Sequence, residues 1–383
     1  MKNVYMDNNA TTRVAPEVVD VMLPFFGELW GNPSSMHYFG GQVARHIEAA
    51  RAQVAALIGA DPTEIVFTSC GSESDNMATR GGLEAAGPQI RLITSRVEHA
   101  AILGPARHYA EHGGEVVEIG VDASGQLDLA ELHRELANGH ALVSLMWANN
   151  ETGVIFPIDE IAAMVKQAGS VFHTDAVQAV GKLPIDVRRT PVDMLSLSGH
   201  KLHAPKGIGA LYVRKGTKLN PFLLGGHQES GRRGGTENVP YIVGLGKACD
   251  MAAHYLGEET TRVAALRNRL ELGLLDTCPD TSINGDRIKR LPNTCNISFQ
   301  FIEGEGILYH MSDAGIAASS GSACTSGSLE PSHVIRAMGV PFTAAHGSIR
   351  FSLCRYNTEE EVDYVIETLP PIITRLRELS PFV

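Results

Sequence analysis

Short β-rich runs alternate with amphipathic helical stretches along much of this 383-residue chain. The predicted strands lie at residues 64–68, 89–94, 115–119, 141–146, 170–173, 194–197 and 208–213. The predicted helices between them lie at residues 74–86, 100–112, 127–137 and 158–168. Strands separated by helices of this length need crossover connections, which join parallel neighbours. The sequence therefore predicts an α/β fold on a mostly parallel sheet.

A mainly helical stretch at 237–275 separates this region from a second one with an α+β pattern. The second region has strands near 296–299 and 348–353, a helix near 303–314 and a closing helix from Thr358. At about 100–200 residues per domain, two domains fit the length. We predict a large domain over 15–255 and a smaller α+β domain formed by 1–14 and 256–383.

The formal charge of -11 argues against nucleic-acid and anionic-membrane partners, because polyanions would be repelled. The longest apolar run, 141–148, is broken by Ser144 and is too short to span a membrane. The N-terminus carries no secretory signal pattern. None of the six cysteines forms a C-x-x-C pair, so we expect neither a metal site nor a redox dithiol. We expect a cytoplasmic protein.

Polar clusters follow five of the predicted strands, at residues 67–76, 97–99, 147–151, 173–178 and 196–201. In open α/β sheets, ligands bind beyond the carboxyl ends of the strands. The sequence therefore predicts one polar site at this edge. In the first cluster, Gly71 and Ser72 stand at a helix start suited to a phosphate, with Ser72 as a candidate N-cap. A plain cap closed by Asp75 is the simpler alternative.

Asp175 ends an apolar strand, where a carboxylate is costly without a partner. That partner could be a protonated ring nitrogen, or Asp175 could cap the following helix. Gln178 lies one turn further on and could reach the same ligand. His99 could stack on an aromatic ring, act as an acid or base, or be a hydrogen-bonded core histidine.

Lys201 lies in a rigid, glycine-rich stretch, 198–207. A buried lysine near a phosphate and an aspartate suits a Schiff base to an aldehyde cofactor. Spacing does not choose between Lys201 and Lys206, although we expect Lys206 to be structural.

Cys324 lies among small residues and glycines at 317–328, a composition typical of a mobile, exposed segment. Exposed thiols in such segments are candidates for reactivity, with Cys70 as the nearest rival. Arg350, in the alternating strand 348–352, could clamp a substrate carboxylate through two hydrogen bonds. Pairing with an acidic side chain at a domain edge is the alternative.

These residues resemble the pyridoxal-phosphate cysteine desulfurases of the class V aminotransferase group, most closely the nitrogen-fixation (NifS) type. The resemblance covers essentially the whole chain, from the motifs at 5–12 and 31–37 to the last helix, and is most specific around Lys201 and at 319–331. It implies a fold-type I pyridoxal-phosphate-dependent transferase. It also implies conversion of L-cysteine to L-alanine, with the sulfur carried as a persulfide for iron–sulfur cluster assembly.

The resemblance implies a role for each site residue. Lys201 would bind the cofactor and later move the Cα proton, and Cys324 would attack the substrate sulfur and transiently meet an iron–sulfur cluster. His99 would lie on the cofactor ring and transfer a proton. The other cofactor residues would be Asp175, Gln178, Gly71, Ser72, Ser198, His200 and, from the second subunit of a homodimer, Thr236. Asn150 and Arg350 would bind the substrate carboxylate, and a scaffold protein would accept the sulfur.

The sequence departs from the family at two positions. Ser230 stands where arginine is common, which changes the charge expected at the site entrance. Cys354 replaces a small residue and would be a second accessible thiol near Arg350. The short stretch after Ser380 favours the nitrogen-fixation type.

Several alternatives stay open. A selenocysteine lyase or another class V enzyme, such as an aminotransferase, would use the same fold. A catalytically inactive sulfur carrier or scaffold-binding module is the non-enzyme alternative. A thiol hydrolase would pair Cys324 with His333 or His346 and need no cofactor.

Overall fold

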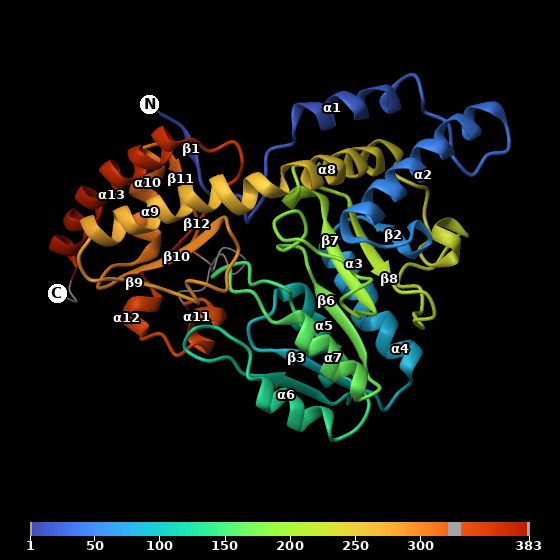
Figure 1. Ribbon diagram of the computed structural model, residues 1–383, viewed down its shortest axis with the longest axis horizontal. Coiled ribbons are helices and arrows are strands. Elements are labelled where there is room, and N and C mark those ends of the chain that lie inside the picture. The colour runs from blue at the N-terminus through green and yellow to red at the C-terminus, as the bar shows by residue number, and fades with distance from the viewer. Residues whose placement is uncertain (1, 321–330, 381–383) are drawn as a thin grey trace.

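A computed structural model describes residues 2–320 and 331–380 of the chain (Figure 1). Cys324, the predicted nucleophile, lies outside the described residues.

A seven-stranded sheet in the order β2-β8-β7-β6-β5-β3-β4 forms the centre of the larger part of the molecule (Figure 1). Its strands are β2 (Ile65–Thr68), β3 (Arg91–Ser95), β4 (Val116–Ile119), β5 (Ala141–Ser144), β6 (Val171–Asp175), β7 (Met194–Ser198) and β8 (Gly209–Val213). Only β8 runs antiparallel to its neighbours, β2 and β7. All other pairs are parallel, which confirms the predicted mostly parallel sheet.

Helices cover both faces of this sheet. Successive strand side chains point to opposite faces, so Val66 packs on one face and Ile65 and Phe67 pack on the other. The Val66 face is covered by a helical run of α3 (Gly71–Asn76), the π-helical turn η3 (Met77–Gly81) and α4 (Gly82–Ala86), together with α5 (Ala100–Glu111). The opposite face is covered by α2 (Tyr38–Ile58), α6 (Leu129–Leu136), α7 (Ile158–Gln167) and α8 (Val239–Glu258). Burial on both faces explains why apolar side chains stand on both faces of these strands.

The helix α2 shows why these sequences form packed helices. Its buried residues include Val43, Ile47, Ala50 and Val54, whose spacing of three or four places them on one face. It packs beside α8, which also contacts α1 (Pro16–Met22) and the short η1 (Leu23–Phe26). Short 3-10 turns η2 (Pro62–Glu64), η4 (Gly199–Lys201) and η5 (Gln228–Gly231) join the remaining elements.

The helix α8 continues through a π-helical turn, η6 (Glu259–Val263), into α9 (Ala264–Thr277), which enters the second part of the molecule (Figure 1). There an antiparallel sheet has the order β12-β10-β9, with β9 (Thr281–Ile283), β10 (Thr294–Phe299) and β12 (Ser348–Ser352). Its helices are α10 (Gly304–Asp313), α11 (His333–Ala337), α12 (Phe342–Ala345) and α13 (Glu359–Leu379). The predicted strands and helices of this region are confirmed, and β9, α11 and α12 are additions.

The N-terminal segment ties the two parts together. The strand β1 (Val4–Tyr5) pairs in parallel with β11 (Ile316–Ala317), and Thr12 N–H then donates to His200 O at 2.9 Å. One apolar core combines residues between 15 and 252 with Leu291 and parts of α11 and α12. A second combines Val4 and Met6 with residues between 263 and 373. The predicted division into 15–255 and the rest stays a prediction. No described helix is long and apolar enough to cross a membrane.

Candidate active site

The carboxyl ends of the central strands come together at one edge of the sheet. A side-chain carbon at Gly71, after β2, would lie 2.9 Å from Val177 Cγ2 and 3.3 Å from Ser198 Cβ. Trp147 N–H, after β5, donates to Asp175 O at 2.8 Å. The turns after β2, β5, β6 and β7 are therefore in direct contact, as expected for a site at this edge.

Lys201 ends the short η4 turn, and its amine is largely withdrawn from solvent. Lys201 Nζ donates to Asn9 O, and to Ala10 O at 2.8 Å. Burial, together with the positive charges of Arg350 and Lys182, lowers the pKa of Lys201 to about 7. Lys206, the alternative within the same stretch, is exposed. Of the two lysines, only Lys201 has the surroundings that turn a lysine into a neutral nucleophile near pH 7.

Asp175 ends β6, and its Oδ1 accepts a hydrogen bond from Val177 N–H at 2.9 Å. Burial raises the pKa of this carboxyl, whereas His99 and Lys201 act in the opposite direction. The local bond resembles the cap that the sequence offered as an alternative, and the role of Asp175 toward a ring nitrogen stays a prediction. A buried carboxylate with one backbone donor retains acceptor capacity for a cationic partner.

Behind Asp175 lies a buried network that sequence reasoning missed. The His173 ring lies between two serines: its Nδ1 is 2.9 Å from Ser144 Oγ, and its Nε2 is 2.9 Å from Ser196 Oγ. Asp75 Oδ1 is 3.7 Å from His173 Nε2. Burial lowers the pKa of His173 to about 3, and burial together with the Asp175 charge raises that of Asp75 well above its usual range. This wall of the site is therefore neutral beside the Asp175 carboxylate.

The predicted cap of Ser72 closed by Asp75 is wrong. The helix α3 begins at Gly71 with Cys70 as N-cap, and no side chain caps it. Ser72 is exposed in the first turn, whereas Asp75 is 1% exposed. The reason is register: the N-cap lies two residues earlier, at Cys70, which turns Asp75 toward the sheet instead of toward the helix end.

His99 caps α5, since its Nδ1 accepts a hydrogen bond from Ala101 N–H at 3.1 Å. Burial lowers the pKa of His99, so the ring is neutral and carries its proton on Nε2. The preceding Glu98 is fully buried, and burial raises its pKa to about 8. His333, considered above for a thiol hydrolase, places Nε2 3.0 Å from Glu98 O.

The residues predicted to hold a phosphate differ in their surroundings. Ser198 Oγ is buried and has no hydrogen-bond partner within residues 2–320 and 331–380. His200 Nδ1 lies 3.2 Å from Thr11 Oγ1, and burial lowers the pKa of His200 to about 4. Thr236 is exposed and lines a separate cavity of about 160 Å³ with Phe67, Thr68, Ser69 and other residues, and none of the other predicted cofactor residues lines it. One chain therefore does not bring Thr236 to Lys201.

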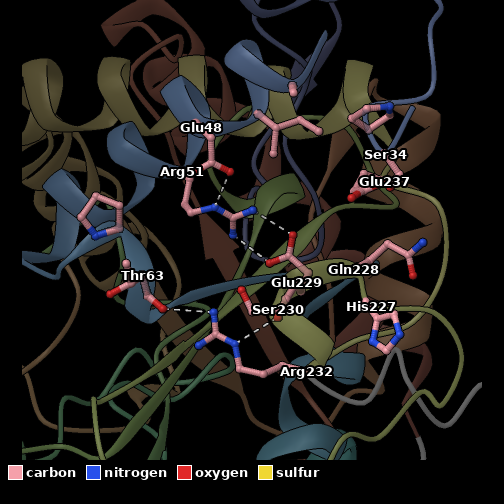
Figure 2. A pocket seen from close by; sticks show the side chains of 14 residues that line it. Ser34, Glu48, Arg51, Thr63, His227, Gln228, Glu229, Ser230, Arg232 and Glu237 are labelled. Carbon is pink, nitrogen blue, oxygen red and sulfur yellow. Dashed lines mark hydrogen bonds and ion pairs between the residues drawn. The ribbon is translucent and has the colours of Figure 1, made fainter. Parts of the chain in front are cut away.

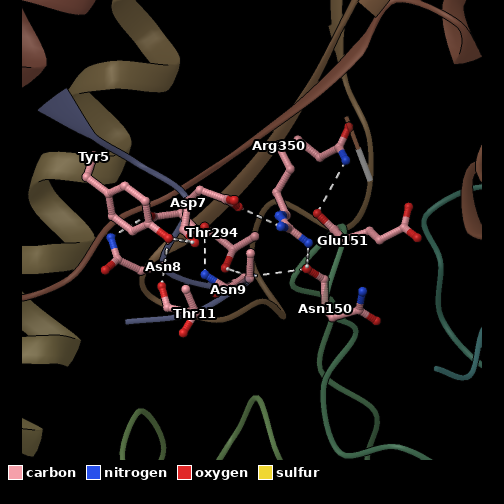
Figure 3. Close-up of polar contacts among 12 residues, drawn as sticks. Tyr5, Asp7, Asn8, Asn9, Thr11, Asn150, Glu151, Thr294 and Arg350 are labelled. Carbon is pink, nitrogen blue, oxygen red and sulfur yellow. Dashed lines mark hydrogen bonds and ion pairs between the residues drawn. The ribbon is translucent and has the colours of Figure 1, made fainter. Parts of the chain in front are cut away.

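Arg350, on β12, approaches the site from the second part of the molecule (Figure 3). Its Nη2 donates to Asp7 Oδ1 at 2.7 Å and its Nη1 to Asn150 O at 3.0 Å. Its buried Nε has no partner among the described residues. The guanidinium thus pairs with an acidic side chain, which is the alternative that the sequence left open. Asn150 contributes its carbonyl to this arrangement.

Asn9 connects the groups around Lys201, although sequence reasoning gave it no role. Its carbonyl accepts from Gln178 Nε2 at 3.0 Å as well as from Lys201. Its side chain donates to Thr294 Oγ1 at 2.8 Å and to Asn150 O at 3.2 Å (Figure 3). The only signal in the sequence was the family resemblance of the 5–12 motif.

Ser230 lines a surface cavity of about 600 Å³ (Figure 2). Within it, Arg51 makes two hydrogen bonds to Glu229, of 2.7 and 2.9 Å, and Arg232 donates to Thr63 O at 3.0 Å. Two arginines and the three glutamates Glu48, Glu229 and Glu237 line this cavity, so an arginine in place of Ser230 would have added a third positive charge to it.

Cys354 is not the accessible thiol that the sequence suggested. It is 8% exposed, and burial raises its pKa to about 11, so it stays a protonated thiol.

We expect Cys354→Ser to leave cysteine turnover within about twofold and to lower the free energy of unfolding by about 1–2 kcal/mol, because it buries a hydroxyl. Sulfide assays and urea unfolding measure the two effects. Strong loss of activity in a normally folded variant would contradict this assignment.

Comparison with known proteins identifies the family. The model of the family described as aminotransferase class-V matches residues 4–365. The chain belongs to the class-V aminotransferase family. A class-V relative, "Cysteine desulfurase NifS" of Azotobacter vinelandii, is 55% identical over 383 residues, covering 100% of this chain and 95% of that protein. "Cysteine desulfurase" of Gluconacetobacter diazotrophicus is 58% identical over 384 residues, covering 100% and 96%.

A solved structure named "NIFS-LIKE PROTEIN" superposes with a TM-score of 0.91 at 39% identity, over 98% of this chain and 100% of that one. These class-V relatives confirm the resemblance to the cysteine desulfurases and the predicted fold-type I architecture. Family membership implies pyridoxal-phosphate chemistry.

Proposed function

We propose that this chain is a cytoplasmic, homodimeric cysteine desulfurase that converts L-cysteine to L-alanine and carries the sulfur as a persulfide on Cys324. The sulfur would pass to an iron–sulfur scaffold protein, in the service of nitrogen fixation. The observation that carries the proposal is the Lys201 amine, buried against two backbone carbonyls, with a pKa of about 7. Such an amine suits attack on an aldehyde at neutral pH.

The residues present fit pyridoxal 5'-phosphate. The buried Ser198 hydroxyl lacks a partner among the described residues, and at Gly71 a side chain would fill the space beside it. Lys201 would hold the aldehyde carbon and Asp175 the ring nitrogen. The further contacts would come from His99, Gln178, Gly71, Ser72, Ser198, His200 and the partner subunit's Thr236. When bound, the cofactor supplies an electron sink that stabilises negative charge at the substrate carbon.

The chain's own groups account for the remaining steps. Arg350 and Asn150 would orient the substrate carboxylate, using the donor that Arg350 Nε keeps free among the described residues. Neutral Lys201 would take the proton from the substrate Cα. His99 would donate a proton from Nε2 and not accept one there, because its Nδ1 already accepts the Ala101 N–H.

Cys324 would complete the reaction as a thiolate. Its sulfur attacks the substrate sulfur, so an S–S bond forms while the substrate Cβ–S bond breaks. The electron pair of the broken bond stays on Cβ, which takes up a proton and becomes the methyl group of L-alanine. The persulfide left on Cys324 is reduced by the two thiol groups of an external dithiol, which becomes a disulfide while sulfide is released and the Cys324 thiol is restored.

The proposed activity is tested with purified protein, pyridoxal phosphate, L-cysteine and dithiothreitol. We expect equal amounts of sulfide and L-alanine. Sulfide accompanied by pyruvate and ammonia would indicate an eliminating lyase, and turnover without the cofactor would favour the thiol hydrolase. Parallel reactions with L-selenocysteine compare kcat/KM and test the selenocysteine lyase alternative.

The pKa of Lys201 predicts how cofactor capture depends on pH. Only the neutral amine attacks the aldehyde, so the capture rate of cofactor-free protein should rise with pH and level off above a midpoint near 7. Borohydride trapping after short incubations, followed by peptide mapping at Lys201, measures this rate. A rate that still increases toward pH 10.5, the ordinary lysine value, would contradict the prediction.

A further inference from the structure

A second buried amine, Lys182, lies in the turn after β6 and is 6% exposed. The preceding Gly181 has a φ of +75°, and a side chain there would lie 2.5 Å from Leu202 Cδ2. This close approach packs the Lys182 turn against the chain that follows Lys201. Lys182 and Lys201 line one cavity of about 20 Å³ together with Glu259, His203 and Cys354. A cavity of this size has room for about one water molecule.

Hydrogen bonds connect the two amines. Lys182 Nζ donates to Gln178 O at 3.1 Å and lies 3.5 Å from Gln178 Oε1. Gln178 Nε2 in turn donates to Asn9 O at 3.0 Å, and Asn9 O also accepts from Lys201 Nζ. Gln178 therefore fixes the position of the Lys182 ammonium group relative to Lys201.

Charged and titratable groups surround both amines. The charged or titratable groups around Lys201 are Arg350, Lys182, Asp7, Asp175, His99 and His200. Those around Lys182 are Glu259, Cys354, Lys201, His200 and His203. Glu259 is 6% exposed, and its Oε2 has no hydrogen-bond partner in the described part of the chain. This buried carboxyl favours the charged form of Lys182, although the Arg355 guanidinium lines the same cavity. At Lys201 the Arg350 charge disfavours the charged form, with Asp7 and Asp175 acting in the opposite direction.

The two amines consequently differ in their titration. Burial lowers the pKa of Lys182 to about 8, with Glu259 acting against it, and that of Lys201 to about 7. Two ammonium groups around one small, poorly solvated cavity repel each other strongly. The first proton therefore goes to Lys182, and its charge disfavours a second proton on Lys201.

We propose that Lys182 is a positioning residue for Lys201: its ammonium group, held by Gln178 and facing Glu259, keeps the neighbouring amine neutral. The inference rests on the proposed function. In that function Lys201 must be neutral, because it attacks an aldehyde and accepts the Cα proton. Lys182 itself would act only through Lys201.

The test is an NMR titration of full-length, cofactor-free protein that is isotope-labelled at lysine Cε. The Lys201 signal is the one missing from Lys201→Arg, and the Lys182 signal is the one missing from Lys182→Arg. In the wild type, Lys201 should titrate at lower pH than Lys182. Lys182→Met should raise the Lys201 midpoint by about one pH unit, because it removes a positive neighbour. Lys182→Arg should restore the original midpoint.

Lys218→Met is the matched control, because Lys218 is an exposed lysine in the loop after β8 and should leave the Lys201 midpoint unchanged. An unchanged midpoint in folded Lys182→Met would overturn the proposal. Lys182→Gln keeps a hydrogen-bonding group and carries the same expectation if the methionine variant does not fold. The wild type alone also tests the proposal: a titration midpoint of Lys201 at higher pH than that of Lys182 would overturn it. The titration uses neither cofactor nor cysteine, so failure of the proposed function appears separately in the desulfuration assay.

Discussion

Lys201→Ala should lower kcat/KM for L-cysteine by more than about 1,000-fold, because one amine provides both the covalent hold on the cofactor and the base for the Cα proton. The variant should also lose the absorbance of lysine-bound pyridoxal phosphate and the borohydride-trapped peptide. Absorbance spectra and a sulfide assay on the same preparation measure the two effects together. Thermal unfolding should remain cooperative, since removal of a desolvated amine creates no unpaired charge.

Lys206→Ala is the matched control for that experiment. Lys206 belongs to the same glycine-rich stretch but is exposed. Its replacement should change kcat/KM by no more than about twofold, as is usual for a solvated side chain. If Lys206→Ala lost the bound cofactor while Lys201→Ala kept it, the assignment of the two lysines would be reversed.

Cys324→Ala should reduce sulfide release by more than about 1,000-fold while the absorbance of bound cofactor stays unchanged. The division of labour explains this: Lys201 binds the cofactor, whereas Cys324 would carry the sulfur. The other cysteines offer no easy replacement. Cys249, Cys278, Cys295 and Cys354 are buried, and burial raises the pKa of each. Spectra and sulfide assays before and after the substitution measure both effects.

Cys70→Ala is the control, because Cys70 is half-buried at the start of α3 and is the remaining free thiol of the described chain. It should retain activity within about threefold. Activity lost in Cys70→Ala but kept in Cys324→Ala would move the nucleophile to Cys70. Activity kept in both would rule out a cysteine persulfide on either.

The central sheet was predictable because its pattern is local. Each strand is a short apolar run, each helix has its own periodicity, and the connection lengths imply parallel pairing. The strand β9, Thr281–Ile283, escaped prediction because it is three residues long and none of them is fully buried. Its existence depends on pairing with β10, a contact that the local sequence does not encode.

The site residues were predictable only where a residue with a reactive side chain stands at or shortly after the end of a predicted strand. Asp175 and Lys201 both follow apolar strands in polar surroundings, so their residue types were informative. Asn9 and Asp7 reach the site from the N-terminal segment, more than 190 positions before Lys201, with no local sign of that approach. Asp75 was misjudged because a two-residue change in the helix start moved it from the cap to the buried wall.

A single turnover analysed by mass spectrometry tests the central claim most directly. Protein loaded with pyridoxal phosphate is mixed with less than one equivalent of L-cysteine in the absence of any reductant, and then alkylated and digested. The account predicts one additional sulfur atom on the peptide that contains Cys324, with one L-alanine formed for each sulfur transferred. Alanine or pyruvate formed with no sulfur on that peptide would contradict it.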